Sequence, residues 1–569
     1  MDHHPLPTRP LAGVTIALVV LIVLLALAAP ALAADGVRVI PAGLDWPQGS
    51  QIRADVSADI VVFQDLTQLT ADLPMWADAK YLGNDSLPIH LDPSLGDATF
   101  QWMPKVFVDD GEGDGRVDAD DTIYVVWTRS TLAPENDDIE IWKGHYDPAA
   151  DTWTPVATYP KTLVSGTAAV GAAASSSQRD PAIGAVGSGA DRRIIVAWED
   201  TRDNGYDAPL IYVLNLSAVN VDDPDWESVS AADAGFPVDF TPIAARGQWN
   251  PTVGPAGVFW MDERWSFWDD GNLKDTAIWR AHLSGDSMPS GVFSYDSDHA
   301  YDNGLWGGDD GLCATYNGAA WLHSGPYGAD NQLPYAKAVG GSGAVLTALD
   351  NSFGLDAEYG FSTARTVYAL DAPHGALGSD GDVFFYDSYT HTRVPVCNRS
   401  GAEPPFVYTS TMGAVGPAAG LARVVWSDAR NNTNPDNDEA DLRLYEAFVP
   451  GVSLKISARS IRLRSHVHLT ASVAPNFAGA TVYFQLVKVG KRFGAPVYTT
   501  SKLLNARMTL GSRSTASRTW TPPARGTYHL RAWFAGGTKY SPNGTVPVGK
   551  ERLVPHVPNG SKVLTLVVR

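Results

Sequence analysis

The chain has 569 residues, of which 44% are hydrophobic, and a formal net charge of −21 at pH 7. It is too long for one ordinary domain, and its apolar content is sufficient for more than one hydrophobic core. Residues 451–569 hold 18 Lys and Arg and a single acid, Glu551, so they carry +17 whereas the remainder carries −38. This asymmetry indicates two domains in different surroundings, and the acidic part would repel phosphate, which argues against nucleic acid as a partner.

Residues 1–33 have the pattern of a signal peptide. Arg9 is the only basic residue, an apolar run extends from Leu11 to Ala29, and Ala31-Leu32-Ala33 offers a small-x-small cleavage site. We therefore predict export and a mature chain that starts at Ala34. The apolar run is long for a signal peptide, so an uncleaved membrane anchor is the alternative, and only then would the protein meet a membrane.

A short apolar run ending in Trp-x-Asp-x-Arg recurs between residues 55 and 450. A Gln or Asn with Pro three residues later precedes several copies, and a run carrying an aromatic follows each copy. These aromatics span 303 residues from Trp142 to Tyr445 in four intervals, or about 76 residues per repeat. The copies are Ile194–Arg202, Val258–Arg264 and Val424–Arg430, together with Ile123–Arg129, which lacks the Asp, and Ala344–Asp350, which keeps only the general pattern. The Gln or Asn and the Pro that precede them, which we call the lead-ins, are Gln101/Pro104, Gln178/Pro181, Gln248/Pro251 and Asn331/Pro334.

The runs are rich in Val, Ile, Trp and Tyr and are separated by Gly, Asn, Asp and Pro, which is typical of strands. About 76 residues can hold a four-stranded blade, and radial repetition of blades gives a β-propeller. We predict five blades, with six as the alternative, and expect the strand Asp59–Phe63 to complete a blade begun by the C-terminal end of the ring. Asp200 and Arg202 share a face of a strand, so we expect them to pair and fix the turn.

This repeat resembles those of TolB-like and related bacterial propellers, in which a Trp-x-Asp-x-Arg strand end precedes an Asp-Ile-Tyr-like strand. The resemblance covers about residues 55–450 and implies a propeller without implying a ligand. The chain differs from sialidase-type propellers, because no copy contains a Ser-x-Asp-x-Gly-x-Thr-Trp box.

Residues 110–121 resemble the calcium loop of dockerins and EF-hands. Acids fall at positions 1, 3, 5, 9 and 12, Gly115 at position 6 permits the sharp bend, and Val117 at position 8 is expected to tuck the loop against the body. The next residues read as a strand, so we predict a calcium loop between two strands of a blade; the alternative is a solvated acidic turn. The resemblance implies side-chain ligands from Asp110, Glu112, Asp114 and Asp121, the carbonyl of Arg116, and Asp118 directly or through water.

Two long inserts, residues 284–331 and 371–404, are predicted to lie on one rim and to be the first place to look for a polysaccharide or protein ligand. They contain Cys313 and Cys397, about one repeat apart. Export permits a disulfide between adjacent blades, and two buried thiols are the alternative.

Residues 451–569 follow a different pattern, with about seven short alternating strands that fit a β-sandwich. The series Pro523–Gly536 and the following Tyr540-Ser541-Pro542 resemble bacterial Ig-like domains of secreted proteins. Such domains act as spacers, stalks or adhesive modules. We expect the +17 charge of this domain to meet either an anionic cell-wall polymer or the acidic propeller of the same chain.

Common catalytic motifs are absent from the sequence: it has no His-Glu-x-x-His, Gly-x-Ser-x-Gly, P-loop or Cys-x-x-Cys. The best single catalytic candidate is Asp180, at the start of a predicted first strand, because a pair of acids can hydrolyse a glycosidic bond. The equivalent positions hold Met103, Asn250 and Leu333, which supply no second carboxylate in register. The favoured hypothesis is a non-enzymatic, calcium-stabilised binding or structural protein, secreted or at the cell surface; an extracellular glycosidase on a five-bladed propeller is the alternative.

Overall fold

The computed structural model shows an all-β protein in which none of the described residues forms a helix long and apolar enough to span a membrane. The predicted signal segment, residues 1–33, lies outside the described residues. Those residues are 50–66, 75–84, 86–93, 99–110, 116–131, 137–156, 160–162, 177–189, 192–201, 209–217, 236–237, 247–262, 268–269, 272–273, 277–281, 312–315, 318–324, 332–338, 344–345, 354–360, 365–373, 381–387, 390, 392–397, 417–428, 443–474, 477–492, 495–505, 507–540, 553–556 and 558–569.

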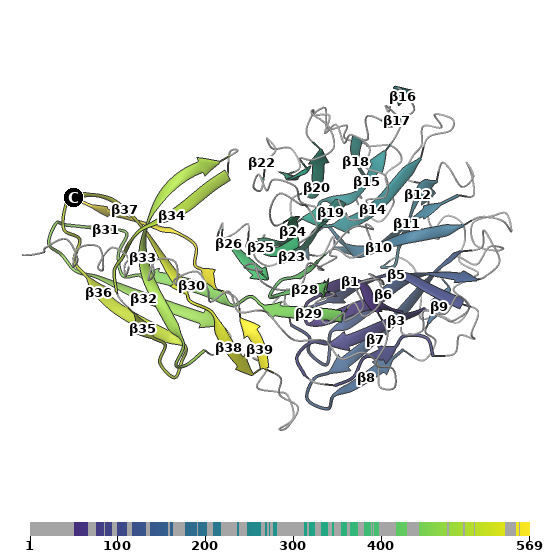
Figure 1. Ribbon diagram of the computed structural model, residues 1–569, viewed down its shortest axis with the longest axis horizontal. Coiled ribbons are helices and arrows are strands. Elements are labelled where there is room, and N and C mark those ends of the chain that lie inside the picture. Colours follow the sequence, from purple (N-terminus) through teal and green to yellow (C-terminus); the bar gives the residue numbers. More distant parts are fainter. Residues whose placement is uncertain are drawn as a thin grey trace, which may run out of the picture.

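Seven sheets follow one another along the described residues from 50 to 448, and each has its first strand at one edge (Figure 1). Buried Trp, Val and Ile side chains on the second strands form much of the core between sheets. A separate hairpin, β16 (Trp268–Asp269) and β17 (Asn272–Leu273), projects from the fourth. In chain order the sheets are β1 (Ser50–Ser57), β2 (Ile60–Leu66), β3 (Trp76–Tyr81), β4 (Ile89–His90); β5 (Thr99–Asp109), β6 (Thr122–Thr131), β7 (Asp138–Asp147), β8 (Thr152–Pro155), β9 (Lys161–Thr162); β10 (Gln178–Val186), β11 (Arg193–Asp200), β12 (Leu210–Asn215), β13 (Phe236–Pro237); β14 (Gln248–Gly254), β15 (Gly257–Asp262), β18 (Ala277–Ala281); β19 (Leu312–Thr315), β20 (Gly318–Ser324), β21 (Gln332–Ala338), β22 (Ala344–Val345); β23 (Gly354–Gly360), β24 (Arg365–Pro373), β25 (Gly381–Asp387), β26 (Thr392–Cys397); and β27 (Ala418–Gly420), β28 (Arg423–Asp428), β29 (Arg443–Phe448).

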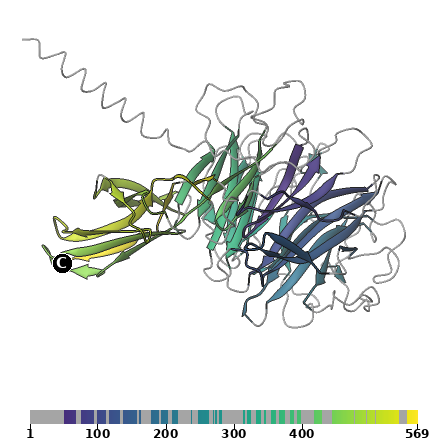
Figure 2. The same ribbon diagram turned by 90° about the horizontal axis from the view of Figure 1, so that it is seen from below.

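The first strands contact one another in cyclic order, from β1 through β5, β10, β14, β19, β23 and β27 and back to β1. Sheets repeated radially around inner strands form a β-propeller, as predicted, and its blades are seen in two views in Figures 1 and 2. The described residues form seven blades, so the prediction of five or six was wrong. The repeat aromatics from Trp142 to Tyr445 skip the fifth sheet, which begins inside the stretch read as an insert. The predicted copy Ala344–Asp350 was misassigned, because its described start, β22, is the outermost strand of this sheet, whereas the Trp-x-Asp-x-Arg copies lie on second strands.

The N-terminal strand does not complete a C-terminal blade, contrary to the prediction. Residues 50–90 form a whole blade, β1 to β4, and the ring closes by packing of this blade's face against the last blade. Val56 and Phe63 share a buried cluster with Val425, and Ser427 Oγ donates to Gln51 O at 2.8 Å. Side-chain packing therefore closes the ring in place of a shared sheet.

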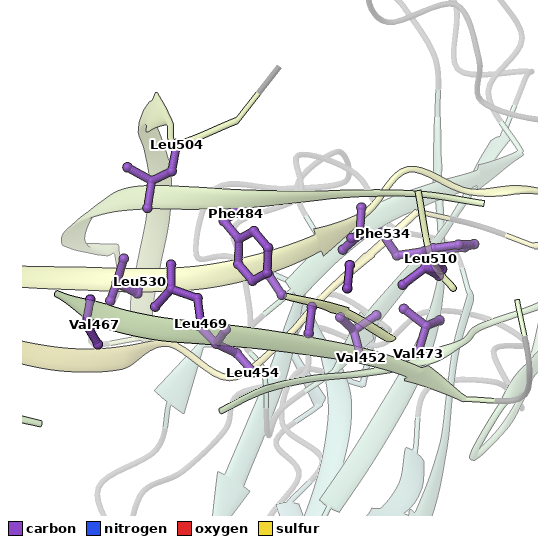
Figure 3. Packing of buried hydrophobic residues seen from close by; sticks show 14 of the residues in the cluster. Val452, Leu454, Val467, Leu469, Val473, Phe484, Leu504, Leu510, Leu530 and Phe534 are labelled. Carbon is purple, nitrogen blue, oxygen red and sulfur yellow. The ribbon is translucent and has the colours of Figure 1, made fainter. Parts of the chain in front are cut away.

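The described residues of 451–569, apart from those between 537 and 556, form an Ig-like β-sandwich, as predicted. Strand β31 pairs in parallel with β41, the last strand of the domain. Tyr528 Oη donates to Ala524 O at 2.8 Å, which is the tyrosine corner found in such sandwiches. The core between the sheets includes Leu469, Phe484 and Phe534 (Figure 3). One sheet is β30 (Gly451–Ile456), β32 (Val467–Ala474) and β36 (Thr515–Trp520); the other is β31 (Ser460–Ile461), β41 (Leu564–Val568), β37 (Gly526–Phe534), β33 (Thr481–Arg492) and β34 (Ala495–Leu503), with β35 (Met508–Thr509) beside β33 and β40 (Asn559–Gly560) beside β37.

The connection between β37 and β41 extends the last blade of the propeller. It contributes β38 (Gly537–Tyr540) and β39 (Leu553–His556), and β39 pairs in parallel with β29, with Phe448 opposite His556. Figure 1 shows this hairpin beside β29. The last sheet therefore contains strands from both sequence regions, which the pattern of the sequence did not predict.

Side chains of the sandwich also pack on the propeller near this shared sheet. Trp533 packs against the cluster that contains Phe385 and Trp426 of the sixth and seventh blades. Arg531 is buried beside Trp533, with its Cζ 4.8 Å from the centre of the indole ring. Asn559 Nδ2 donates to Pro450 O at 2.7 Å at the junction. The two domains thus share a packed interface.

Consecutive blades are joined by a buried glutamine near the start of an inner strand. Gln101 Oε1 accepts from Ala77 N at 2.5 Å, and Gln248 Oε1 accepts from Ile211 N at 2.9 Å. In each case the donor belongs to the third strand of the preceding blade, so the Gln of the Gln-x-x-Pro lead-in is a latch between blades at Gln101 and Gln248. The fourth lead-in was misassigned, because Pro334 lies in β21, a third strand, and Asn331 lies outside the described residues.

We expect Gln248→Met to lower the free energy of unfolding by about 1–3 kcal/mol, because it leaves the buried Ile211 amide without its acceptor. Urea denaturation of the full chain measures this as a lower midpoint with an unchanged slope. An unchanged midpoint would show that the latch does not contribute to stability.

Candidate functional site

The predicted calcium loop lies between two strands of the second blade, after β5 and before β6. Asp110 and residues 116–121 are described, whereas Glu112 and Asp114 lie outside the described residues. Val117 is 3% exposed and belongs to the core cluster between the first two blades. The prediction that this apolar residue tucks the loop against the body is confirmed.

The end of the loop is held by Asp121, which is buried. Its Oδ2 accepts from Asp118 N at 2.7 Å, and its backbone carbonyl lies 2.7 Å from His145 Nδ1. Burial raises the pKa of Asp121 to about 6, the Asp118 N–H lowers it, and the nearby Asp110, Asp118 and Asp120 raise it again. Carboxylates that raise one another's pKa are a favourable place for a cation.

The donor chemistry of these carboxylates fits Ca²⁺, but the described residues alone bring together no group of three acids or histidines with metal-binding geometry. Asp118 and Arg116 are exposed, and Asp110 is half-buried. A calcium ion would be held by Asp110, Asp118 and Asp121 together with the two predicted acidic ligands outside the described residues.

A second candidate site lies where four successive inner strands are interrupted by a β-bulge. The bulges occur in β1, β5, β10 and β14, and in each a residue other than Gly lies in the left-handed region, two residues after a buried glutamine. Such residues cost about 1–3 kcal/mol each and concentrate at functional sites. The four are Arg53 (φ 52°), Met103 (51°), Asp180 (51°) and Asn250 (52°), and we call them the bulge residues.

The bulge residues lie at one end of the propeller, which we call the glutamine end. Gln101 pairs with Arg129 across β5 and β6, whereas Asp109 pairs with Thr122 beside the calcium loop. The residues that flank the predicted calcium loop are therefore at the opposite end. Because the inner strands contact one another in order, the bulges of the first four blades form a continuous arc around the axis.

Arginine and tryptophan side chains from adjacent blades meet along this arc. The Arg53 guanidinium lies over the Trp102 ring at 5.8 Å, and the Arg179 guanidinium lies over the Trp249 ring at 5.2 Å. A Cβ on Gly247 would come within 2.4 Å of Trp249 Nε1. Glycine at this position therefore allows the Trp249 indole to occupy its place.

Asp180, the catalytic candidate, is half-buried beside a second carboxylate that the sequence did not predict. Glu199 is fully buried at the end of β11, and it accepts from Arg179 Nε at 3.0 Å and from Asn250 N at 2.8 Å. Burial raises the pKa of Glu199 well above its usual value, Asp180 raises it further, and Arg179 lowers it. The second carboxylate comes from the neighbouring strand of the same blade, so a search restricted to equivalent repeat positions could not find it.

The predicted pairing of charged residues at strand ends is present in the second blade in a different form. Arg129 donates to Asp138 at 3.0 Å and to Glu140 at 2.8 Å, and both acids lie on the neighbouring strand β7. In the third blade Asp200 accepts from Trp198 Nε1 at 3.2 Å, and Arg202 lies outside the described residues. These groups fix the strand ends at the glutamine end.

Cys313 is a buried thiol in β19, and its Sγ lies 3.6 Å from Ala320 O. Its strand is the innermost of the fifth blade, whereas Cys397 ends the outermost strand of the sixth blade. Cys313 is thus a buried cysteine thiol, as the alternative prediction has it. The side chain of Cys397 lies outside the described side chains.

Comparison with known proteins gives little beyond the architecture. No protein-family profile matches the chain, and none of the curated proteins matches it. Among solved structures, the crystal structure of TolB from Acinetobacter baumannii aligns over 62% of this chain and 83% of that chain, at 13% sequence identity and a TM-score of 0.27. The propeller assignment here follows from the order and contacts of the sheets.

Proposed function

We propose that this protein is an exported, non-enzymatic binding protein, secreted or held at the cell surface, whose propeller presents a ligand site and whose Ig-like domain is a spacer or adhesion module. The observation that carries the proposal is the arc of bulges, which gathers Arg, Trp, Asp and Asn side chains from four blades at one end. Several chemically different side chains converging on one place are typical of binding sites. The site is placed at the glutamine end in preference to the predicted rim inserts, most of whose residues lie outside the described ones.

An extracellular glycosidase is the second candidate, because Asp180 and Glu199 are two neighbouring carboxylates with a raised pKa on one of them. Glu199 is fully buried, and its two oxygens are engaged by Arg179 and the Asn250 amide. A carboxylate held in this way is better suited to fixing the bulges than to reaching a substrate. Turnover of a polysaccharide that disappears in Asp180→Asn would favour the enzyme.

The calcium proposal is tested by titrating Ca²⁺ into the full exported chain in a calorimeter. We expect binding to the wild type and at least a tenfold weaker binding to Asp121→Asn, because one carboxylate ligand becomes a neutral amide. We also expect Ca²⁺ to raise the melting temperature of the wild type, since a ligand that binds only the folded state stabilises it.

Asp120→Asn is the matched control for the calcium titration. Asp120 is exposed and adjacent, but it occupies position 11, which supplies no ligand in the resembled loops. Its affinity should stay within about threefold of the wild type, since only a screened surface charge is lost. Equal loss in both variants would show diffuse charge attraction, and no binding to the wild type would leave the loop an acidic turn.

The basic Ig-like domain supports a second contact, with an anionic cell-wall polymer. Its described outer residues include Lys455, Lys488 and Lys502, all exposed. The alternative partner for this charge is the acidic propeller of the same chain, on which the domain packs. Wall retention that is unchanged up to about 0.5 M salt would exclude the polymer contact, because such contacts are screened.

A further inference from the structure

The end of the sandwich that lies away from the propeller carries five exposed arginines. Figures 1 and 2 mark the C-terminus at this end. None of the five side chains takes part in an ion pair or a hydrogen bond with another described residue. The one acid of residues 451–569, Glu551, lies outside the described residues. We call the five the tip arginines: Arg459, Arg462, Arg464, Arg525 and Arg569.

Three of the tip arginines form a row at the ends of adjacent strands. The end of β31 and the start of β37 both pair with Val568 of β41. The next residues outward on the three strands are Arg462, Arg525 and Arg569, and Leu463 N donates to Arg569 O at 2.9 Å. Val568 is buried in the core, so the alternation of side chains along a strand turns Arg569 outward. Adjacent strands are about 4.8 Å apart, so the row spans about 10 Å.

This row of like charges costs stability when it has no partner. Residues opposite each other on adjacent strands repel when both are positive, and this happens twice, between Arg462 and Arg569 and between Arg569 and Arg525. A carboxylate at the end of residue 569 would offset one of the five charges and leave four. An exposed arrangement that repels itself in this way is explained by an anion that binds from outside.

The acidic propeller of the same chain is too far from the tip to be that anion. Strand β37 runs from the tip at Gly526 to Trp533, which packs on the propeller. The seven steps between them cover about 24 Å at about 3.4 Å per residue. This length is more than twice the Debye length of about 8 Å at physiological ionic strength. Of the two partners considered for the basic domain, the anionic polymer is therefore the one that can reach the tip.

We propose that the row binds a linear cell-wall polymer that carries one oxyanion, a phosphodiester or a carboxylate, on each repeating unit. A guanidinium binds such an oxyanion through two parallel N–H groups. A straight row of cations about 5 Å apart matches successive charges along a linear polymer, whereas a folded protein or an ordinary peptide presents acids at irregular distances. The inference rests on the proposed export and assigns the contact with an anionic polymer to named residues.

A membrane surface fits the tip less well than a polymer. Binding to a bilayer surface gains strength from apolar side chains that enter it as well as from charge. The exposed large apolar side chains of the described residues are Val489 and Leu503. Both lie on β33 and β34, outside the three strands that carry the row.

The experiment is calorimetric titration of the full exported chain at several salt concentrations. The probes are poly(glycerol phosphate), polygalacturonate, neutral dextran and a peptide with irregularly spaced acids; vesicles that contain anionic lipid are tested by cosedimentation. At least one of the two charged polymers should bind, and dextran should not. The slope of log K against log salt concentration should be about −3.5 for five arginines, if each counts about −0.7 as in single-stranded polyanions.

Arg462→Gln/Arg525→Gln removes the two outer charges of the row. We expect polymer binding to weaken at least tenfold and the salt slope to become less negative by about 1.4. The melting temperature should stay the same or rise, because two repulsive pairs disappear. A residue needed only for folding would give the opposite change in melting temperature.

Arg507→Gln/Arg513→Gln is the matched control, because it removes the same charge from the other end of the sandwich. Arg507 Nε donates to Thr481 Oγ1 at 2.9 Å, and Arg513 precedes the start of β36. Both ends of chain lie on the propeller side, where Val482 pairs with Phe534. The affinity of this variant for the polymer should stay within about threefold of the wild type.

Several outcomes would overturn the inference. Equal loss of binding in the two double variants would show diffuse attraction to the whole domain. An acidic peptide that binds as tightly as the polymers would remove the match of spacing, and vesicle binding without polymer binding would assign the tip to a membrane. Binding of no probe would also overturn the inference, while the calcium loop and the arc of bulges, which involve other residues, would stand. A chain that is retained inside the cell would instead overturn the proposed function, whatever the tip binds.

Discussion

Arg423→Met is expected to lower the free energy of unfolding of the propeller by about 3–5 kcal/mol, the cost of leaving buried charges without their partner. Arg423 begins β28, and its side chain is fully buried where the last blade meets the first. Its Nε lies 2.7 Å from Asp59 Oδ1, and its Nη1 lies 3.3 Å from Glu446 Oε2. Removing the cation leaves two carboxylates buried at the closure of the ring.

Urea denaturation followed by tryptophan fluorescence measures the loss, because the buried indoles lie in the propeller core. Arg459→Met is the control, since Arg459 is exposed in the sandwich and the change should stay within about 0.5 kcal/mol. Adding Asp59→Asn to Arg423→Met should recover part of the stability by removing one uncompensated charge. A destabilisation below about 1 kcal/mol in Arg423→Met would show that solvent reaches the closure.

The propeller and the sandwich could both be predicted, because each depends on the periodicity of side chains along the sequence. Buried Trp198, Trp260 and Trp426 all lie on second strands and carry the repeat, so the propeller could be recognised from them. The Ig-like sandwich could be recognised because its strands alternate regularly, as in β32, where apolar residues are buried and the intervening ones are more exposed. These features are local, and a local pattern is readable from one sequence.

The blade count was missed because it depends on strands that lack the repeat. The second strand of the fifth blade, Gly318–Ser324, keeps a Trp at position 321 but has no Asp-x-Arg end, so it was not recognised as a copy of the repeat. The 303 residues from Trp142 in the second blade to Tyr445 in the seventh were therefore divided into four intervals, whereas these blades are five intervals apart. Regular spacing in sequence measures only the copies that still carry the motif.

Of the second candidate site, at the bulges, only Asp180 was predicted from the sequence. Arg53, Trp102 and Trp249 lie at positions defined by a bulge, and a bulge is a property of the pairing register that the sequence does not display directly. One signal was available: each lies one or two residues after a Gln that begins an inner strand. Glu199 and Arg423 could not be predicted, because their partners are brought together by strand pairing and by ring closure across 364 residues of sequence.

Removing residues 451–569 is expected to destabilise the propeller as well as to delete the sandwich. The last blade would lose β38 and β39, which would leave β29 as an open edge. The cluster covered by Trp533 would be exposed to water, at a cost of about 2 kcal/mol for that side chain alone. The truncated propeller should therefore melt at a lower temperature and aggregate more readily than the propeller of the full chain.

Scanning calorimetry distinguishes a fused molecule from two independent domains. The shared sheet and interface predict that Trp533→Ala in the full chain lowers the melting temperature of the propeller as well as that of the sandwich. Trp520→Ala is the matched control: this indole packs against the sandwich core, far from the shared sheet, and should affect the sandwich first. A truncated propeller that melts at the same temperature as in the full chain would show that β39 and Trp533 add nothing to it. Coupling of this kind would make the Ig-like domain a rigid support that holds the glutamine end, the proposed ligand site, in a fixed orientation.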